Sequence, residues 1–214
     1  MLSQGTQRGA LVDVFVTRGA TTADAPPAAQ RGRAMLGRAA REAALAVVGV
    51  VALALSAHVI IPLPFTPVPI TGQTFAVLLL AAAYGAPRGL ASVALYLLAG
   101  AAGLPVFAAA SGVYTDGYLA GFALAALVVG WLAQRGWDRA FPTAIAAMLA
   151  GEIAIDACGL LWLARFVGWG HVVALGLTPF IVGDALKLLA AALLLPAAWF
   201  ATRRILGREP RADV

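Results

Sequence analysis

The sequence predicts an all-α integral membrane protein with six transmembrane helices and both termini in the cytoplasm. Hydrophobic residues fill 62% of the 214 positions, charged residues fill 12%, and the mean hydropathy is +0.89. This composition is typical of a membrane protein rather than of a globular one. From about Glu42 onward, apolar runs alternate with short polar or Pro/Gly breaks, and arginines gather in every second break.

The expected spans are the apolar segments 42–61, 70–84, 88–104, 117–134, 142–164 and 179–201. Several approach the ~20 residues that cross a hydrocarbon core, whereas the second and third are short. Together they predict a membrane domain over residues 41–205. A disordered cytoplasmic extension is expected over 1–40 and a cytoplasmic tail over 206–214.

Arginine positions predict the orientation of this bundle. Ten arginines lie in the extension, in alternate connections or near the C-terminal end: Arg31, Arg33, Arg38, Arg41, Arg88, Arg135, Arg139, Arg203, Arg204 and Arg208. The opposite connections, 62–69, 105–116 and 165–178, contribute only Arg165. Because basic residues favour the cytoplasmic side, both termini are expected there, which requires an even number of spans.

Two charges in the last apolar segment are the strongest pointer to function. Lys187 is the only lysine in the chain, and it follows Asp184 by three residues. Residues at i and i+3 share one face of a helix, so the two can pair or face a ligand together. A charge near the centre of a bilayer costs roughly 2.5–3.5 kcal/mol on insertion scales, which makes a functional role the favoured interpretation.

The fifth segment carries two further carboxylates, Glu152 and Asp156, which share a face at i and i+4. They would repel each other unless one is protonated or a cation such as Lys187 lies nearby. We expect these groups to belong to a ligand site. The alternative is a buried salt bridge that only fixes helix packing.

Other candidate site residues are uncharged. Gln73 follows the Pro-rich stretch 61–70 and can offer hydrogen bonds to a ligand, although it can also cap the second span. Phe107, Tyr118 and Trp162 are expected to form apolar walls. The four prolines within 61–70 make a stiff segment that is either a lid over the pocket or a plain connector.

Several functions are disfavoured by what the sequence lacks. A nucleotide-binding loop needs Gly-Lys-Ser/Thr, but Lys187 lies between two leucines, Leu186 and Leu188. No catalytic signature and no Cys/His cluster with metal-ligand spacing are present, so we expect neither an enzyme nor a metal site. The dispersed arginines favour membrane topology over nucleic-acid binding, and no cofactor is expected.

Several blocks of the chain resemble the BioY family. They are Phe65-Thr-Pro-Val-Pro-Ile-Thr-Gly-Gln-Thr-Phe75, Tyr96-Leu-Leu-Ala-Gly-Ala-Ala-Gly-Leu-Pro-Val-Phe107, Gly117-Tyr-Leu-Ala-Gly-Phe122, Gly159-Leu-Leu-Trp-Leu163 and Pro179-Phe-Ile-Val-Gly-Asp-Ala-Leu-Lys187. The resemblance runs in matching order from about residue 45 to 195. The chain departs from the usual family pattern at Val113–Tyr118, and at Asp156, where a tyrosine is frequent.

This resemblance implies the biotin-specific S component of an energy-coupling-factor (ECF) transporter. Such a protein lies in the bacterial cytoplasmic membrane and binds biotin with high affinity from outside. Transport then needs a transmembrane coupling protein and ATPase subunits. The resemblance also makes Asp184 and Lys187 ligand-site residues and favours ligand roles for Gln73, Tyr118 and the Pro-rich segment. Which end of biotin meets the charged pair stays open.

Two rival functions are weighed beside this one. The first is an S component for another vitamin, because part of the assignment depends on family blocks. The second is a retinal-type photoreceptor, since a lysine in the last span with an aspartate one turn earlier suits a Schiff base and its counter-ion. Six spans and an aromatic content of 8% argue against the photoreceptor.

Overall fold

The computed structural model describes residues 10–13, 28–109 and 112–206. In these ranges the chain forms the helices α2 (Ala28–Ala57), α3 (Gln73–Tyr84), α4 (Ala86–Ala101), α5 (Asp116–Gln134), α6 (Phe141–Val167), α7 (Val172–Gly176) and α8 (Ile181–Leu206). Two short strands, β1 (Ile60–Ile61) and β2 (Ile70–Thr71), lie between α2 and α3. The expected all-α architecture is confirmed.

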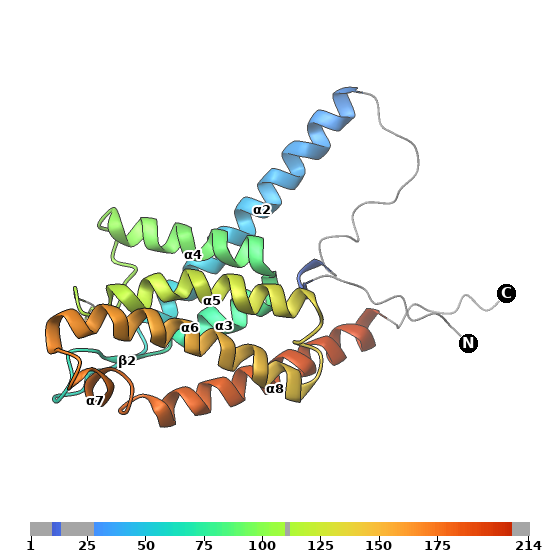
Figure 1. Ribbon diagram of the computed structural model, residues 1–214. Helices are drawn as coiled ribbons and strands as arrows, with labels where there is room; N and C mark the ends of the chain where they lie inside the picture. Colours follow the sequence, from blue (N-terminus) through green and yellow to red (C-terminus); the bar gives the residue numbers. More distant parts are fainter. Residues whose placement is uncertain (1–9, 14–27, 110–111, 207–214) are drawn as a thin grey trace.

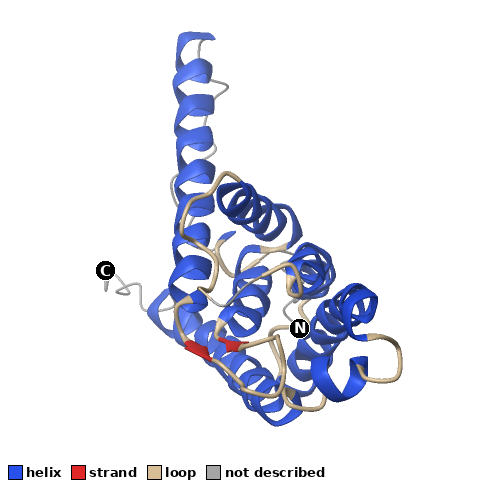
Figure 2. Ribbon diagram, turned by 90° about the vertical axis from the view of Figure 1, so that its left-hand side faces the viewer, coloured by secondary structure: helices blue, strands red, loops and turns tan. Residues whose placement is uncertain are grey.

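The long helices lie side by side in one elongated bundle (Figure 1). Helix α5 is its centre, because it packs against α3, α4 and α6. Helix α8 packs against α6 and α3 on one flank, and α2 packs against α4 and α3 on the other. The N-terminal half of α2 rises away from the other helices, as Figures 1 and 2 both show.

One end of the bundle carries most of the connecting structure, including β2 and α7 (Figure 1). Strands β1 and β2 pair antiparallel, with Ile60 opposite Thr71 and Ile61 opposite Ile70. The Pro-rich residues 62–69 therefore form the loop of a hairpin. The Thr66 hydroxyl donates a 2.6 Å hydrogen bond to the Leu175 carbonyl of α7, which ties this loop to the same end of the bundle.

Local sequence explains where neighbouring helices meet. Gly85 separates α3 from α4 with φ of +78°, a conformation that favours glycine and turns the chain sharply. Pro87 lies at the start of α4, where a missing N–H costs no helical hydrogen bond. Gly168 ends α6 in the same way, with φ of +77°.

The six expected spans differ in how far the structure supports them. Four helices, α2, α5, α6 and α8, are long and apolar enough to cross a membrane. Helices α3 and α4 are apolar but have only 12 and 16 residues. They are short because the hairpin extends to Thr71 and the turn at Gly85 divides the next apolar stretch into two helices.

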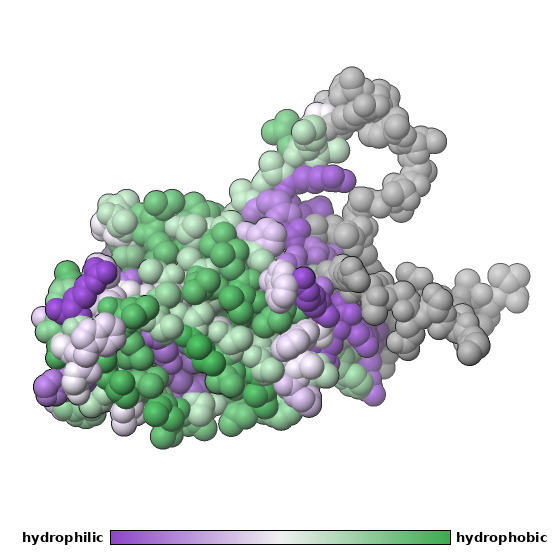
Figure 3. All heavy atoms as spheres, viewed as in Figure 1, coloured by the Kyte–Doolittle hydropathy of each residue, from purple (hydrophilic) through white to green (hydrophobic). Residues whose placement is uncertain are grey.

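The outer surface agrees with a membrane setting. Figure 3 shows a broad hydrophobic face over the body of the bundle, with hydrophilic residues at both ends. Many large apolar side chains are exposed on the bundle, among them Leu124, Leu161 and Leu186. In a bilayer, lipid tails would surround such side chains, and these tails are as apolar as the side chains themselves.

The boundary expected at residue 41 differs from the observed start of the first helix. Helix α2 begins at Ala28, so residues 28–40 of the expected disordered extension are helical. Residues 1–9 and 14–27 of that extension, and 207–214 of the expected tail, lie outside the described residues. Residues 28–40 consist mostly of alanine, arginine and other strong helix formers, which explains the earlier start.

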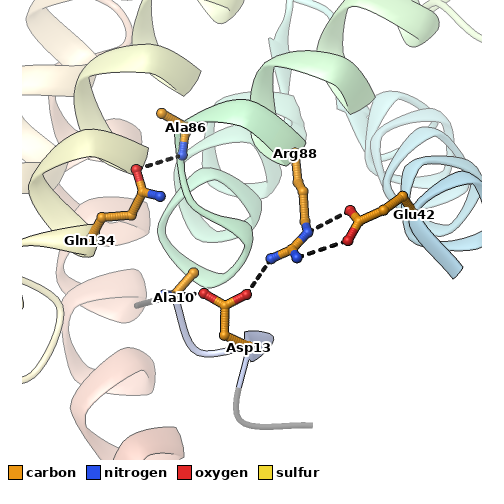
Figure 4. Close-up of polar contacts among 6 residues, drawn as sticks. All are labelled: Ala10, Asp13, Glu42, Ala86, Arg88 and Gln134. Carbon is orange, nitrogen blue, oxygen red and sulfur yellow. Dashed lines mark hydrogen bonds and ion pairs between the residues drawn. The ribbon is translucent and has the colours of Figure 1, made fainter. Parts of the chain in front are cut away.

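Residues 10–13 touch the bundle at the turn between α3 and α4 (Figure 4). The Val12 amide donates to the Ala83 carbonyl, and Asp13 forms an ion pair with Arg88 of α4. The same guanidinium binds Glu42 of α2 through two hydrogen bonds of 2.6 and 2.8 Å. Arg88 thus links three segments that are distant in sequence.

Candidate ligand-binding site

A cavity lies where α3, α5 and α8 begin and the second half of α6 passes them. Its empty volume is about 560 Å³, counting the space at its mouth. The lining residues are Val68, Pro69, Ile70, Thr71, Gln73, Thr74, Thr115, Tyr118, Leu119, Phe122, Glu152, Ile155, Asp156, Phe180, Asp184 and Lys187.

The charged pair of α8 faces this cavity. The Lys187 ammonium donates a 2.9 Å hydrogen bond to Asp184 Oδ1 and a 3.2 Å hydrogen bond to Thr74 Oγ1 of α3. Both charged side chains are mostly buried, with 20% and 13% of their surfaces exposed. The i,i+3 spacing on α8 therefore produces the pair that the sequence predicts, and Thr74 fixes the ammonium from a second helix.

Glu152 and Asp156 of α6 line the same cavity as the pair on α8. Glu152 is buried, with 7% of its surface exposed, and Asp156 is partly exposed. Asp184 and Lys187 act electrostatically on both carboxylates. The site thus brings three acidic groups and one basic group together from two neighbouring helices.

Gln73 and Tyr118 also line the cavity, and each is held by a hydrogen bond. Gln73 Nε2 donates to Tyr96 Oη at 2.7 Å, and the Tyr96 hydroxyl donates to the Val106 carbonyl at 3.1 Å. The Tyr118 hydroxyl donates to the Gly176 carbonyl of α7 at 2.7 Å. These bonds fix both side chains in place at the cavity wall.

Two predicted wall residues are not brought to the cavity. Phe107 packs edge-to-face on Tyr96, with ring centroids 5.3 Å apart. Trp162 lies on α6 beyond Asp156, and its indole N–H donates to the Val113 carbonyl at 2.6 Å. Neither residue is among those that line the cavity. Contact of either side chain with a ligand stays a prediction.

The apolar walls come instead from residues that the sequence alone did not indicate. Leu119 and Phe122 follow Tyr118 on α5, Ile155 lies between the two carboxylates of α6, and Phe180 precedes α8. Helical spacing from Tyr118 could have identified Phe122, because i and i+4 share a face. Val68 lines the cavity from the Pro-rich loop, which supports the lid interpretation of that segment over a plain connector.

The arrangement suits a small ligand that is largely apolar and carries a few polar groups. The ammonium can meet an anionic or carbonyl oxygen, the carboxylates can accept from N–H groups, and the aromatic and aliphatic walls can cover a ring system. No group of three or more His, Cys, Asp or Glu side chains in the described ranges could hold a metal ion.

Comparison with known proteins identifies the relatives of this chain. The Biotin transporter BioY of Thermotoga maritima is 40% identical over 141 residues, which are 63% of this chain and 82% of that protein. The Probable biotin transporter BioY of Pyrococcus horikoshii is 37% identical over 134 residues, or 60% of this chain and 78% of that protein. The Biotin transporter BioY of Rhizobium etli is 36% identical over 148 residues, covering 63% and 79%.

The fold also matches a crystal structure of the S-component for biotin from an ECF-type ABC transporter. The TM-score is 0.59, and the match covers 86% of this chain and 96% of that one, at 21% sequence identity. This likeness shows a shared fold. A model of the BioY family matches residues 26–204, which include the cavity and every helix that lines it. The chain belongs to the BioY family.

Proposed function

We propose that this protein binds biotin in the cavity between α3, α5, α6 and α8 and acts as the S component of an ECF-type transporter. The observation that carries the proposal is the Asp184–Lys187 pair, held over a mostly apolar pocket by Thr74. Its relatives are named biotin transporters, which supports the same ligand. The protein is a transport component and not an enzyme.

The chemistry of biotin suits these walls. Its fused rings are apolar apart from the ureido group, and its aliphatic tail ends in a carboxylate. Lys187 can neutralise that carboxylate or donate to the ureido carbonyl, and a carboxylate of the site can accept from a ureido N–H. Phe122, Ile155 and Phe180 would cover the ring system.

The proposed membrane arrangement has six crossings with both termini in the cytoplasm. In it, α3 and α4 complete the bundle despite their length, and the cavity opens to the outside of a bacterial cytoplasmic membrane. Energy would come from a transmembrane coupling protein and ATPase subunits, because this chain has no nucleotide-binding loop. No cofactor is assigned.

Isothermal titration of biotin into detergent-purified protein tests the proposal. We expect saturable one-to-one binding, with a tryptophan fluorescence change as a second readout. Competition with riboflavin, thiamine and desthiobiotin separates biotin from other vitamins. Absence of binding at micromolar biotin, or stronger binding of another vitamin, would contradict the proposal.

A further inference from the structure

The charges of the cavity lead to an inference about protons, which rests on the proposed function. We propose that Glu152 carries a proton in the biotin-bound state and donates it in a hydrogen bond to an acceptor oxygen of biotin. Biotin binding is then coupled to pH through this one side chain. No covalent bond forms or breaks in biotin, and the proton comes from solvent.

The first support is the balance of charge in the cavity. Three carboxylates, Glu152, Asp156 and Asp184, face one ammonium, Lys187. That ammonium is already bonded to Asp184 and Thr74. If every carboxylate were ionised, the pocket would be negative before an anionic ligand entered it. In a poorly solvated site, repulsion between neighbouring carboxylates favours protonation of one of them.

The second support is the setting of Glu152 itself. Its side chain is more than nine-tenths buried and lines the cavity. Within the described part of the chain, Oε1 has no hydrogen-bond partner. Burying an ionised carboxylate without a partner is costly, whereas a neutral carboxyl needs only an acceptor for its hydrogen.

Among the described neighbours of Glu152, the cation is Lys187, and its ammonium is already bonded to Asp184 and Thr74. Helix α6 adds Asp156, and α8 adds Asp184 with Lys187. Helix α3 contributes the uncharged Gln73 and Thr74, and the Tyr118 hydroxyl of α5 is directed to the Gly176 carbonyl. The ligand is therefore the natural partner of this side chain.

The other two acids are less suited to carry the proton. Asp184 already has an ammonium partner at 2.9 Å, so its hydrogen-bonding capacity is met within the protein. Asp156 is more exposed than Glu152, so water can solvate its charge. Both acceptor groups of biotin, the ureido carbonyl and the tail carboxylate, are compatible with a carboxyl donor, and the inference holds for either ligand orientation.

Titrations of biotin between about pH 6 and 10 test the inference. If the bound state requires one proton that the free protein has lost, biotin affinity falls by up to tenfold per pH unit at the alkaline end. Titration in two buffers of different ionisation enthalpy then gives a net proton uptake by the wild-type protein. Glu152→Gln keeps an N–H donor without titrating, so it should bind biotin with little change over this range.

A matched control is Asp116→Asn. Asp116 is an exposed carboxylate at the start of α5 that does not line the cavity. This variant should keep both the wild-type affinity and its pH dependence. Circular dichroism and size-exclusion chromatography check that each variant is folded. Should Glu152→Gln fail to fold, the two-buffer measurement on wild-type protein decides alone.

The outcomes separate this inference from the proposed function. Wild-type binding that neither varies with pH nor takes up protons overturns the inference and leaves biotin binding intact. An equal pH dependence in Glu152→Gln overturns it too, because a group other than Glu152 is then responsible. Loss of biotin binding by folded Glu152→Gln at every pH also overturns it. Wild-type protein that never binds biotin overturns the proposed function as well.

Discussion

The Lys187 ammonium donates hydrogen bonds to Asp184 of α8 and to Thr74 of α3. Both partners line the cavity. We predict that Lys187→Ala lowers biotin affinity about ten- to hundredfold, because a hydrogen bond to a charged group is worth roughly 1.5–3 kcal/mol. Titration calorimetry measures the change. Trp169→Phe, which alters an exposed tryptophan that does not line the cavity, should keep wild-type affinity; equal losses in both variants would contradict this site.

Asp138 forms a second buried polar contact, in the connection between α5 and α6. It is fully buried, and the Trp199 indole N–H donates to its Oδ2 at 2.5 Å. Burial raises the pKa of the Asp138 carboxyl, while the hydrogen bond from Trp199 opposes that shift. A carboxyl whose pKa is higher in the folded state makes folding less favourable as pH rises through that pKa.

Trp199→Phe removes the hydrogen bond that favours ionised Asp138. We predict a loss of about 1.5–3 kcal/mol in unfolding free energy near pH 7, and a smaller loss near pH 4, where more of the carboxyl is protonated. Thermal unfolding in detergent at both pH values checks this. Trp169→Phe is the control, because Trp169 is 71% exposed; a loss that does not depend on pH would argue against the role of Asp138.

Residues of the site differ in how far the sequence can reveal them. Asp184 and Lys187 are predictable, since charges inside an apolar segment are rare and i,i+3 spacing fixes their common face. Phe107 lies in an irregular connection, where no period tells which way a side chain points. Trp162 is on the expected helix, but its direction depends on the packing of α5 against α6, which a single sequence does not encode locally.

At the scale of elements, the contact between α5 and α6 depends on Gly159. A Cβ at this position would overlap the ring of Tyr118, which itself lines the cavity. We predict that Gly159→Ala lowers the unfolding free energy by about 1–3 kcal/mol through overpacking. Thermal unfolding measures the effect, and biotin affinity should fall as Tyr118 shifts.

Gly183 provides the matched comparison, as a helical glycine of α8 with no atom within 4 Å of an added Cβ. Gly183→Ala should leave the unfolding midpoint unchanged or slightly raised, since alanine favours helix. If the two alanine variants behave alike, close approach at Gly159 is not what holds α5 against α6.

The elements themselves are largely predictable, and their connections are not. Apolar runs identify the positions of α2, α3, α4, α5, α6 and α8, because membrane helices need continuous apolar sequence. The ion pairs of Arg88 with Asp13 and Glu42 join positions far apart in sequence. A stretch with little apolar periodicity gives no hint of such a partner, so the sequence alone places residues 10–13 in a disordered extension.

At the scale of the whole molecule, the proposed orientation can be measured in cells. In a Cys158→Ala background, we predict that an impermeant maleimide labels Trp169→Cys in intact bacterial cells. Ala140→Cys should react only after the membrane is permeabilised, because the two exposed positions lie at opposite ends of α6. Labelling in the reverse order would contradict the arginine-based topology.

The short helix α4 has a consequence for the surrounding lipid. Its 16 residues rise only about 24 Å, against a hydrocarbon thickness of ~30 Å, and it exposes Leu95 and Leu98. Hydrophobic mismatch at α4 favours a locally thinned bilayer. A thinner bilayer would bring water closer to the β1–β2 hairpin. It would also shorten the hydrocarbon region that biotin crosses. Phospholipids with longer acyl chains make a thicker bilayer. Such lipids should therefore oppose the conformations that α4 and its neighbours adopt during transport.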